Sequence, residues 1–244
     1  ETILRDVRNA LEELRTFMDI GEATIEESQT EDKDWINNWK EFFHQFYVDD
    51  ILIVPSWEEV KEEDKDKMIL HIDPGTAFGT GMHETTQLVI RQLKKYVTRG
   101  AEILDVGTGS GILGITALKL GAGHVVGTDL DPCAVSAVQD NKEANQIEDD
   151  SFDMMIGNII DDVEVQNEVG YERYDIVAAN ILADVLVPLT PVIVHQMKKG
   201  AYYITSGILD VKEEVVREAV EKAGLTLVEV TKQGEWVCVT ARKD

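Results

Sequence analysis

The sequence Asp-Val-Gly-Thr-Gly-Ser-Gly at residues 105–111, followed by a second acid at Asp129, constrains the fold of this 244-residue chain more than any other feature. The pattern predicts a strand, a glycine turn, a helix, a second strand and a carboxylate at the end of that strand. Such a unit builds a pocket for an adenosine-bearing cofactor, because glycines let the backbone approach the ligand and the carboxylate accepts hydrogen bonds from ribose hydroxyls.

Charge narrows the classes of partner. The chain carries 47 acidic residues against 23 Lys and Arg residues, for a formal net charge of −24. Phosphate backbones bind to basic faces, so we expect no direct contact with nucleic acid. The acidic surface is compatible with steering a basic protein partner, and equally with solubility alone.

The cysteines and the apolar segments indicate the compartment. No apolar run approaches the ~18 residues of a membrane span, and no signal-like stretch opens the chain. Cys133 and Cys238 lie far apart and outside any C-x-x-C pair, which predicts no zinc site, redox motif or disulfide framework. We expect a cytoplasmic protein without a metal or a membrane contact. Because the chain opens at Glu1 without a Met, we expect its true start to be missing.

The first 67 residues read as a small piece of a domain and a linker. Apolar residues at helical spacing predict a helix over 3–18, and a strand is expected to begin at 23–25. A second, unusually aromatic helix is expected over 34–46, either packed on the larger domain or exposed to a partner. A short strand over 51–54 and a charged, solvated connector over 58–67 follow.

From Met68 onward the pattern alternates regularly between strand and helix. A strand over 68–72 and a loop over 73–83 lead into a helix over 85–96. Such alternation predicts a parallel sheet with helices on both faces. Further strands are expected near 102–106, 124–128, 152–157, 175–179 and 201–205, and further helices near 112–120, 132–145, 183–196 and 211–223.

The end of the chain breaks this alternation. Residues 225–231 and 236–241 read as two strands joined by a turn, which is a hairpin. This hairpin places an antiparallel strand in an otherwise parallel sheet.

The glycines alone leave two cofactors open. Gly109-x-Gly111-x-x-Gly114, with Asp129 20 residues past Gly109, matches the dinucleotide fingerprint of a dehydrogenase. Four features favour S-adenosylmethionine instead. They are the acid at Asp105, the second glycine spacing in residues 107–111, the helix start Leu-Asp-Pro at 130–132, and the terminal hairpin.

Four segments carry a closer likeness. Residues 73–86 read Asp-Pro-Gly-Thr-Ala-Phe-Gly-Thr-Gly-Met-His-Glu-Thr-Thr, and residues 180–183 read Asn-Ile-Leu-Ala. With Pro-Ser-Trp at 55–57 and Ser-Gly-Ile-Leu at 206–209, they resemble the bacterial ribosomal protein L11 methyltransferase family, over about residues 35–236. The resemblance implies a class I methyltransferase fold, Rossmann-like α/β, whose mostly parallel seven-stranded sheet ends in an antiparallel hairpin. It is preceded by a remnant of a small α+β domain and a linker helix.

The resemblance also implies a domain division and an activity. Residues 1–30 correspond to the C-terminal part of a truncated substrate-recognition domain, residues 31–67 to a linker, and residues 68–244 to the methyltransferase domain. The implied enzyme is a protein-lysine N-methyltransferase that transfers methyl groups from S-adenosylmethionine to lysine ε-amines and the N-terminal α-amine of ribosomal protein L11, several times over. Alternatives are a methyltransferase for another protein or a small molecule, a non-catalytic cofactor-binding module, and an NAD-dependent dehydrogenase.

In the resembled family, cofactor contacts fall at positions matching Thr86, Gly107, Asp129 and Asn180. Asp129 would accept ribose hydroxyls; capping the next helix is the alternative, for which Asp131 is better placed. The hydroxyl of Thr86 can cap its own helix or bind the carboxylate end of the cofactor. Asn180 is expected to orient the target amine, with a turn-forming Asn as the alternative.

Four further positions are expected near the cofactor. Gly109 belongs to the glycine turn, and Phe78 would pack against the sulfonium in a cation–π contact. Asp105 is expected to bind the amides of the turn or the ammonium group of the cofactor. His83 is expected to stabilise its own loop, with general-base catalysis as the alternative, and Trp236 is expected in the core.

Overall fold

The computed structural model describes residues 2–18, 20–25, 44–73 and 81–244, and these divide by their contacts into two units, Glu1–Phe43 and His44–Asp244. The first unit contains α1 (Thr2–Arg15), which confirms most of the helix predicted over 3–18. The strand expected from residue 23 is not formed in the described segment 20–25. Most of the aromatic helix predicted over 34–46 lies outside the described residues, and the domain boundaries at 30 and 67 stay predictions.

A three-stranded sheet opens the second unit. It consists of β1 (Phe46–Val48), β2 (Ile51–Val54) and β3 (Met68–His71), in which β2 pairs antiparallel with β1 and parallel with β3. Phe46 therefore begins a strand, and the prediction that it ends a helix is wrong. The charged connector between β2 and β3 contains a short 3-10 turn, η2 (Glu62–Asp64).

The end of β3 and the segment after it are tied to helix α5 (Cys133–Ala144), through Asn141 in the helix and Asn145 at its C-terminal cap. The backbone N–H of His71 donates to Oδ1 of Asn145 over 2.9 Å, and that of Asp73 donates to Oδ1 of Asn141 over 2.8 Å. Both asparagines are buried. These bonds fix the end of the described segment 44–73 against α5.

The large sheet has seven strands in the order β6-β5-β4-β7-β8-β10-β9. All pairs from β6 to β8 are parallel, whereas β10 is antiparallel to both of its neighbours. The predicted α/β fold with a terminal antiparallel hairpin is thus confirmed. The strands are β4 (Glu102–Val106), β5 (His124–Asp129), β6 (Phe152–Ile156), β7 (Tyr174–Asn180), β8 (Met197–Leu209), β9 (Leu225–Gln233) and β10 (Trp236–Lys243).

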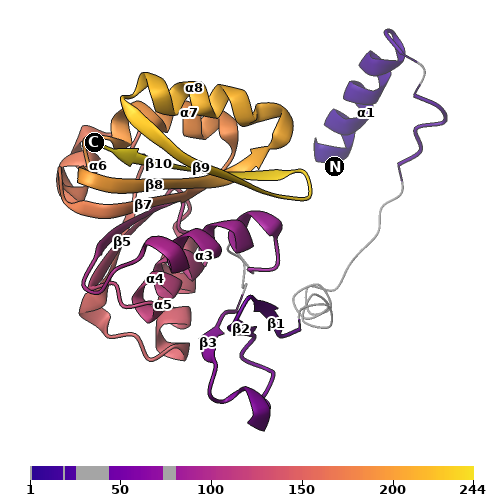
Figure 1. The fold of residues 1–244 in the computed structure, drawn as a ribbon. Helices are drawn as coiled ribbons and strands as arrows, with labels where there is room; N and C mark the ends of the chain where they lie inside the picture. Colours follow the sequence, from indigo (N-terminus) through magenta and orange to yellow (C-terminus); the bar gives the residue numbers. More distant parts are fainter. Residues whose placement is uncertain (1, 19, 26–43, 74–80) are drawn as a thin grey trace. The chain divides into compact units, whose positions relative to one another are not determined.

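Helices cover both faces of this sheet. Those numbered α3 to α5 lie on one face, and α7 and α8 lie on the other (Figure 1). Each face has its own buried apolar cluster, which includes Leu88, Ile115 and Val138 on the first face and Leu186 and Val216 on the second. The remaining bounds are α3 (Glu84–Tyr96), α4 (Ile112–Lys119), α6 (Val163–Val169), α7 (Ala183–Ile193), α8 (Glu213–Lys222), and the 3-10 turns η3 (Asp149–Ser151) and η4 (Asp210–Lys212).

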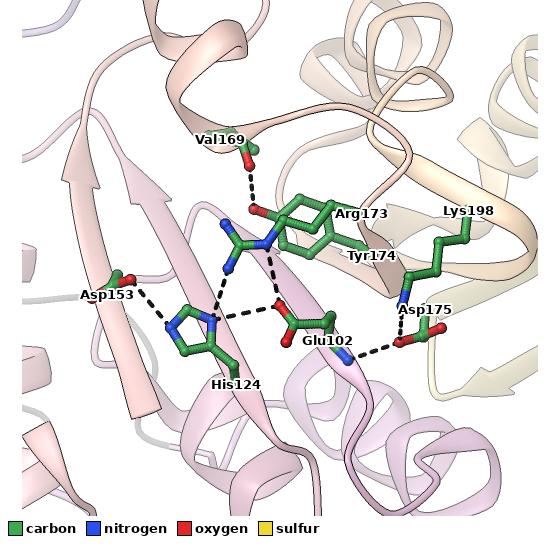
Figure 2. A network of polar contacts seen from close by, with 8 residues as sticks. All are labelled: Glu102, His124, Asp153, Val169, Arg173, Tyr174, Asp175 and Lys198. Atoms are coloured by element: carbon green, nitrogen blue, oxygen red, sulfur yellow. Dashed lines mark hydrogen bonds and ion pairs between the residues drawn. The ribbon is translucent and has the colours of Figure 1, made fainter. Parts of the chain in front are cut away.

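A polar network ties together the starts of four parallel strands (Figure 2). The ring of His124, the first residue of β5, lies between Asp153 of β6 and the pair formed by Glu102 and Arg173. His124 Nε2 lies 3.1 Å from the carboxylate of Asp153, and Arg173 Nε lies 3.2 Å from that of Glu102. The backbone N–H of Glu102 also donates to Asp175 of β7 over 2.9 Å. Ion pairs and hydrogen bonds therefore hold the amino-terminal ends of these strands together, and the cavity lies at their carboxyl ends.

Candidate active site

A cavity of about 680 Å³ lies at the carboxyl ends of the parallel strands. Its lining includes Asp129 at the end of β5, Gly107 after β4 and Asn180 at the end of β7. It continues to Gly207 of β8 and Trp236 of β10. Open parallel sheets bind their ligands at this edge, so the fold itself singles out this cavity. Most of the remaining wall is apolar and includes residues such as Leu182 and Leu189.

The glycine turn shapes the floor of the cavity. Gly107, Gly109 and Gly111 have φ values of 72°, 54° and 80°, which side-chain-bearing residues rarely adopt. A Cβ at Gly107 would lie 2.5 Å from Cγ2 of Ile181. Both conformation and space therefore require glycine at 107. The turn leaves Gly107 and Gly109 facing the cavity, as the sequence predicts for a close backbone approach to a ligand.

Asp105 lies beneath this turn, fully buried. Its Oδ2 accepts hydrogen bonds from the hydroxyl of Thr108 over 2.8 Å and from the backbone N–H of Gly114 over 3.1 Å. Burial raises the pKa of Asp105 to about 6, because the charged form loses its hydration. Asp105 does not line the cavity. These contacts, with a hydroxyl of the turn and an amide of α4, hold the turn against the start of α4. The expected bonds to the amides of the turn or to the cofactor stay a prediction.

Asp129 is oriented by two backbone amides. Its Oδ2 accepts from the N–H of Gly109 over 2.8 Å, and its Oδ1 accepts from the N–H of Asp131 over 2.9 Å. Each carboxylate oxygen retains a second lone pair on the cavity side for a hydroxyl donor. Asp131 in turn accepts from the N–H of Cys133, the first residue of α5. The helix start is thus served by Asp131, and the expected ribose contact of Asp129 stays a prediction.

Asn180 lines the cavity and carries an acceptor that is not used. Its Nδ2 donates to the hydroxyl of Thr86 over 3.1 Å, whereas its buried Oδ1 has no hydrogen-bond partner among the described residues. A buried polar atom without a partner costs free energy, and such an atom at a cavity wall points to a ligand that supplies the donor. The backbone of Asn180 is fixed as well, because it pairs with Ser206 of β8.

Thr86 lies behind Asn180. It is 1% exposed and does not line the cavity, whereas its neighbour Thr85 does. The cap of α3 is His83, whose Nδ1 accepts from the N–H of Thr85, so the capping alternative for Thr86 is not what the structure shows. Among the described residues, the hydroxyl of Thr86 accepts the hydrogen bond from Asn180. The direct cofactor contact expected for Thr86 therefore stays a prediction, and the geometry gives it a supporting role.

Trp236 and His83 form an aromatic part of the cavity wall. Their ring centroids lie 4.8 Å apart with an interplanar angle of 68°. Trp236 is half-buried: it packs against the core cluster of that face, as expected, and it also lines the cavity. Its position follows from topology, because β10 runs antiparallel and its first residue arrives at the edge where the parallel strands end. His83 caps its helix, which agrees with the expected loop-stabilising role.

Several expectations concern residues or ligands beyond these contacts. Phe78 lies outside the described residues. Within the described ranges no group of three or more His, Cys, Asp or Glu side chains is arranged to hold a metal ion. No helix in the same part of the chain is both long and apolar enough to cross a membrane.

The cavity fits S-adenosylmethionine better than a dinucleotide. Among the described residues of its lining there is no Lys or Arg, and the lining includes the acids Asp129 and Asp131. A sulfonium is positively charged and is favoured by such a wall, whereas a pyrophosphate is repelled by it. Gly107 lets the backbone lie close to the ligand, and the carboxylate of Asp129 can accept its ribose hydroxyls. The unused oxygen of Asn180 can accept a hydrogen bond at the reacting end.

Comparisons with known proteins agree with this assignment. The sequence model of the family "Ribosomal protein L11 methyltransferase (PrmA)" matches residues 1–244. Ribosomal protein L11 methyltransferases of Agathobacter rectalis and Lachnospira eligens are 55% and 57% identical to this chain, over 244 and 243 residues. Each alignment covers 99% of this chain and 76% of the relative.

A solved structure shares the architecture. The ribosomal protein L11 methylase of Lactobacillus delbrueckii subsp. bulgaricus superimposes with a TM-score of 0.74 at 31% sequence identity. The superposition covers 83% of this chain and 100% of the other. The likeness in sequence is therefore matched by a likeness in three dimensions.

Proposed function

This chain belongs to the ribosomal protein L11 methyltransferase family, and we propose that it transfers methyl groups from S-adenosylmethionine to amino groups of ribosomal protein L11. The proposal includes lysine ε-amines and the N-terminal α-amine as acceptors. One observation supports it above the others: the unused, buried Oδ1 of Asn180 at the cavity wall, where a donor such as an amine N–H is needed.

Methyl transfer makes modest chemical demands on the protein. The cofactor, when bound, supplies an electrophilic methyl group and a good leaving group, so the chain chiefly aligns the nucleophile. Asp129 would hold the ribose hydroxyls, and the turn at Gly107 would let the backbone lie against the cofactor. Asn180 would accept one N–H of the target amine at Oδ1 and thereby turn the nitrogen lone pair toward the methyl carbon.

The acceptor amine must be neutral when it reacts. For a lysine with a pKa of ~10.4, this costs about 4.6 kcal/mol at pH 7, whereas an α-amine with a pKa of ~7.7–8.0 costs about 1 kcal/mol. The apolar wall and a nearby sulfonium both disfavour the ammonium form. We propose that the amine proton passes to water.

The first part of the chain would select the substrate. We propose that residues 1–30 are the C-terminal part of a substrate-recognition domain, that residues 31–67 link it to the catalytic domain over 68–244, and that the enzyme works in the cytoplasm. The net charge of −24 suits a basic ribosomal protein. Deleting residues 1–30 is expected to abolish methylation of L11 and to spare binding of S-adenosylhomocysteine in calorimetry. Normal methylation by the truncated protein would refute this division.

Mass spectrometry of purified L11 after incubation with enzyme and S-adenosylmethionine tests the function directly. We expect added masses of 14 Da per methyl group, and none with an Asn180→Ala variant that still binds S-adenosylhomocysteine. Asn167→Ala, at an exposed position of α6, is the matched control and should act as wild type. Unmodified L11 with the wild-type enzyme would disprove the substrate. Full activity of Asn180→Ala would remove this residue from the mechanism.

A further inference from the structure

The cavity extends along the sheet edge on both sides of Asn180. Because the strand order is β5-β4-β7-β8-β10, Asp129 at the end of β5 and Trp236 at the start of β10 lie on opposite sides of Asn180. Asp129 marks the ribose end in the proposed function. The space beside Trp236 is therefore on the side of Asn180 that the ribose does not need, where an acceptor amine can approach.

Trp236 is held in place from two directions. Its ring meets the ring of His83 at 4.8 Å, and His83 is fixed through Nδ1, which accepts from the N–H of Thr85 and lies 2.8 Å from the Thr85 hydroxyl. The indole is thus part of a fixed aromatic wall.

The backbone beside Trp236 is tied to that of Asn180. Trp236 pairs with Leu209 of β8, and the next carbonyl along β10, that of Val237, accepts from the hydroxyl of Ser206 over 3.0 Å. Ser206 pairs in turn with Asn180. The amide and the indole are therefore carried on the two strands that flank β8, and their backbones are joined through it.

Successive transfers change what the acceptor nitrogen offers to these two residues. Each transfer forms an N–CH₃ bond, breaks the S–CH₃ bond of the cofactor and leaves an ammonium that loses its proton to water before the next transfer. A neutral primary amine has two N–H groups, a neutral secondary amine has one, and a neutral tertiary amine has none. Oδ1 of Asn180 can therefore orient the primary and the secondary amine by a hydrogen bond and cannot orient the tertiary amine.

We propose that Trp236, braced by His83, is the wall of the amine subsite and determines how far one nitrogen is methylated. This inference rests on the proposed function. The indole face attracts the N-methylated cation and packs against its methyl groups, so its contribution grows as that of Asn180 falls. The lack of Lys and Arg among the described lining residues leaves the cation without a competing charge.

Substitution of Trp236 tests this through the distribution of methyl states. With Trp236→Leu, the third transfer on one lysine should slow by about fivefold to thirtyfold more than the first, since a desolvated cation–π contact is worth about 1–2 kcal/mol. Trp236→Phe should restore most of the trimethylated product. The time course of mono-, di- and trimethylated L11 is followed by mass spectrometry. Equal slowing of all three transfers in Trp236→Leu would overturn the proposal.

A binding measurement separates the cation–π contact from simple packing and does not depend on L11. Nε-trimethyllysine and its uncharged isostere, in which a carbon replaces the nitrogen, are titrated into the protein saturated with S-adenosylhomocysteine. The wild-type protein should prefer the cation by about fivefold or more, Trp236→Phe should keep a preference, and Trp236→Leu should show none. If Trp236→Leu prefers the cation over the uncharged isostere as strongly as the wild-type protein does, the assignment of Trp236 to the amine subsite is overturned. A failure to methylate L11 would instead refute only the proposed function.

Discussion

Asn180 donates its amide N–H to the hydroxyl of Thr86 over 3.1 Å, and the oxygen of the same amide is left without a partner among the described residues. Thr86 thereby fixes the orientation of the Asn180 amide. The hydrogen bond joins the end of β7 to the first turn of α3, two elements that are 94 residues apart in the chain. Thr86 thus has a role in orientation even though it is not among the residues that line the cavity.

The orienting role predicts a difference between two substitutions of Thr86. Thr86→Val keeps the shape and removes the acceptor, so the amide of Asn180 loses its preferred orientation. We expect kcat to fall about tenfold to a hundredfold, with a smaller change in the affinity for S-adenosylhomocysteine. Thr86→Ser keeps the hydroxyl and should retain most of kcat. Similar kinetics for the two variants would contradict the role.

Gly107 and Gly100 offer a matched pair of glycine substitutions. Both have positive φ, 72° and 79°, but only at Gly107 would a Cβ meet another atom, Cγ2 of Ile181 at 2.5 Å. Gly100→Ala should cost about 1–2 kcal/mol of unfolding free energy from the backbone alone. Gly107→Ala should cost about 1–3 kcal/mol more through overpacking, and should also weaken binding of S-adenosylhomocysteine. Equal costs in urea unfolding would show that Ile181 moves aside without penalty.

Asp129→Asn should weaken the binding of S-adenosylhomocysteine by about tenfold to a hundredfold. Hydrogen bonds to a charged acceptor contribute about 1.5–3 kcal/mol. In addition, the carboxylate of Asp129 accepts from the N–H groups of Gly109 and Asp131, and the NH₂ group of an asparagine would face one of these donors. Asp153→Asn removes the same charge at the opposite edge of the sheet and is the control. Calorimetry should show an unchanged affinity for Asp153→Asn, and equal losses in both would indicate a general charge effect.

Asp105 should make stability depend on pH in the direction opposite to that of a paired carboxylate. Its pKa is raised from 3.8 to about 6 in the folded chain, so the folded state binds this proton more tightly than the unfolded state. The resulting stabilisation is present below the unfolded pKa and is lost as the pH rises through about 6, a loss of about 3 kcal/mol.

Asp105→Asn removes this titration. The free energy of unfolding of the wild type minus that of Asp105→Asn should therefore fall by about 2–3 kcal/mol between pH 4 and pH 7. Urea unfolding of both proteins at several pH values measures it. A difference that stays constant with pH would mean that Asp105 titrates alike in the two states.

The regular part of the fold could be predicted because its signals are local. The strand predicted over 102–106 matches β4 residue for residue, and the hairpin strands were placed within two residues of where β9 and β10 end. Helix α6 was missed because its seven residues, Val-Glu-Val-Gln-Asn-Glu-Val, alternate in the way a strand does. Phe46 was assigned to a helix because aromatic residues before it recur at helical spacing, whereas pairing with Ile53 makes it a strand residue.

The site was predictable where a motif carries the chemistry and unpredictable where tertiary contacts do. The roles of Asp129 and Asp131 follow from their spacing around Pro132, and the structure separates them as expected. The partnership of Thr86 with Asn180 depends on how α3 packs beside β7, and no spacing in the sequence encodes it. Trp236 was missed because only the position of β10 within the sheet brings it to the cavity.

Strand β10 lies between β8 and β9, although it is synthesised after both of them. A nascent chain that has not yet released residues 236–243 from the ribosome holds two strand edges with nothing between them, and it lacks the indole at the cleft. A chain in this state exposes two unpaired strand edges, which favour aggregation. The wall of the cavity is therefore completed only when a strand from late in the chain inserts between two strands that precede it.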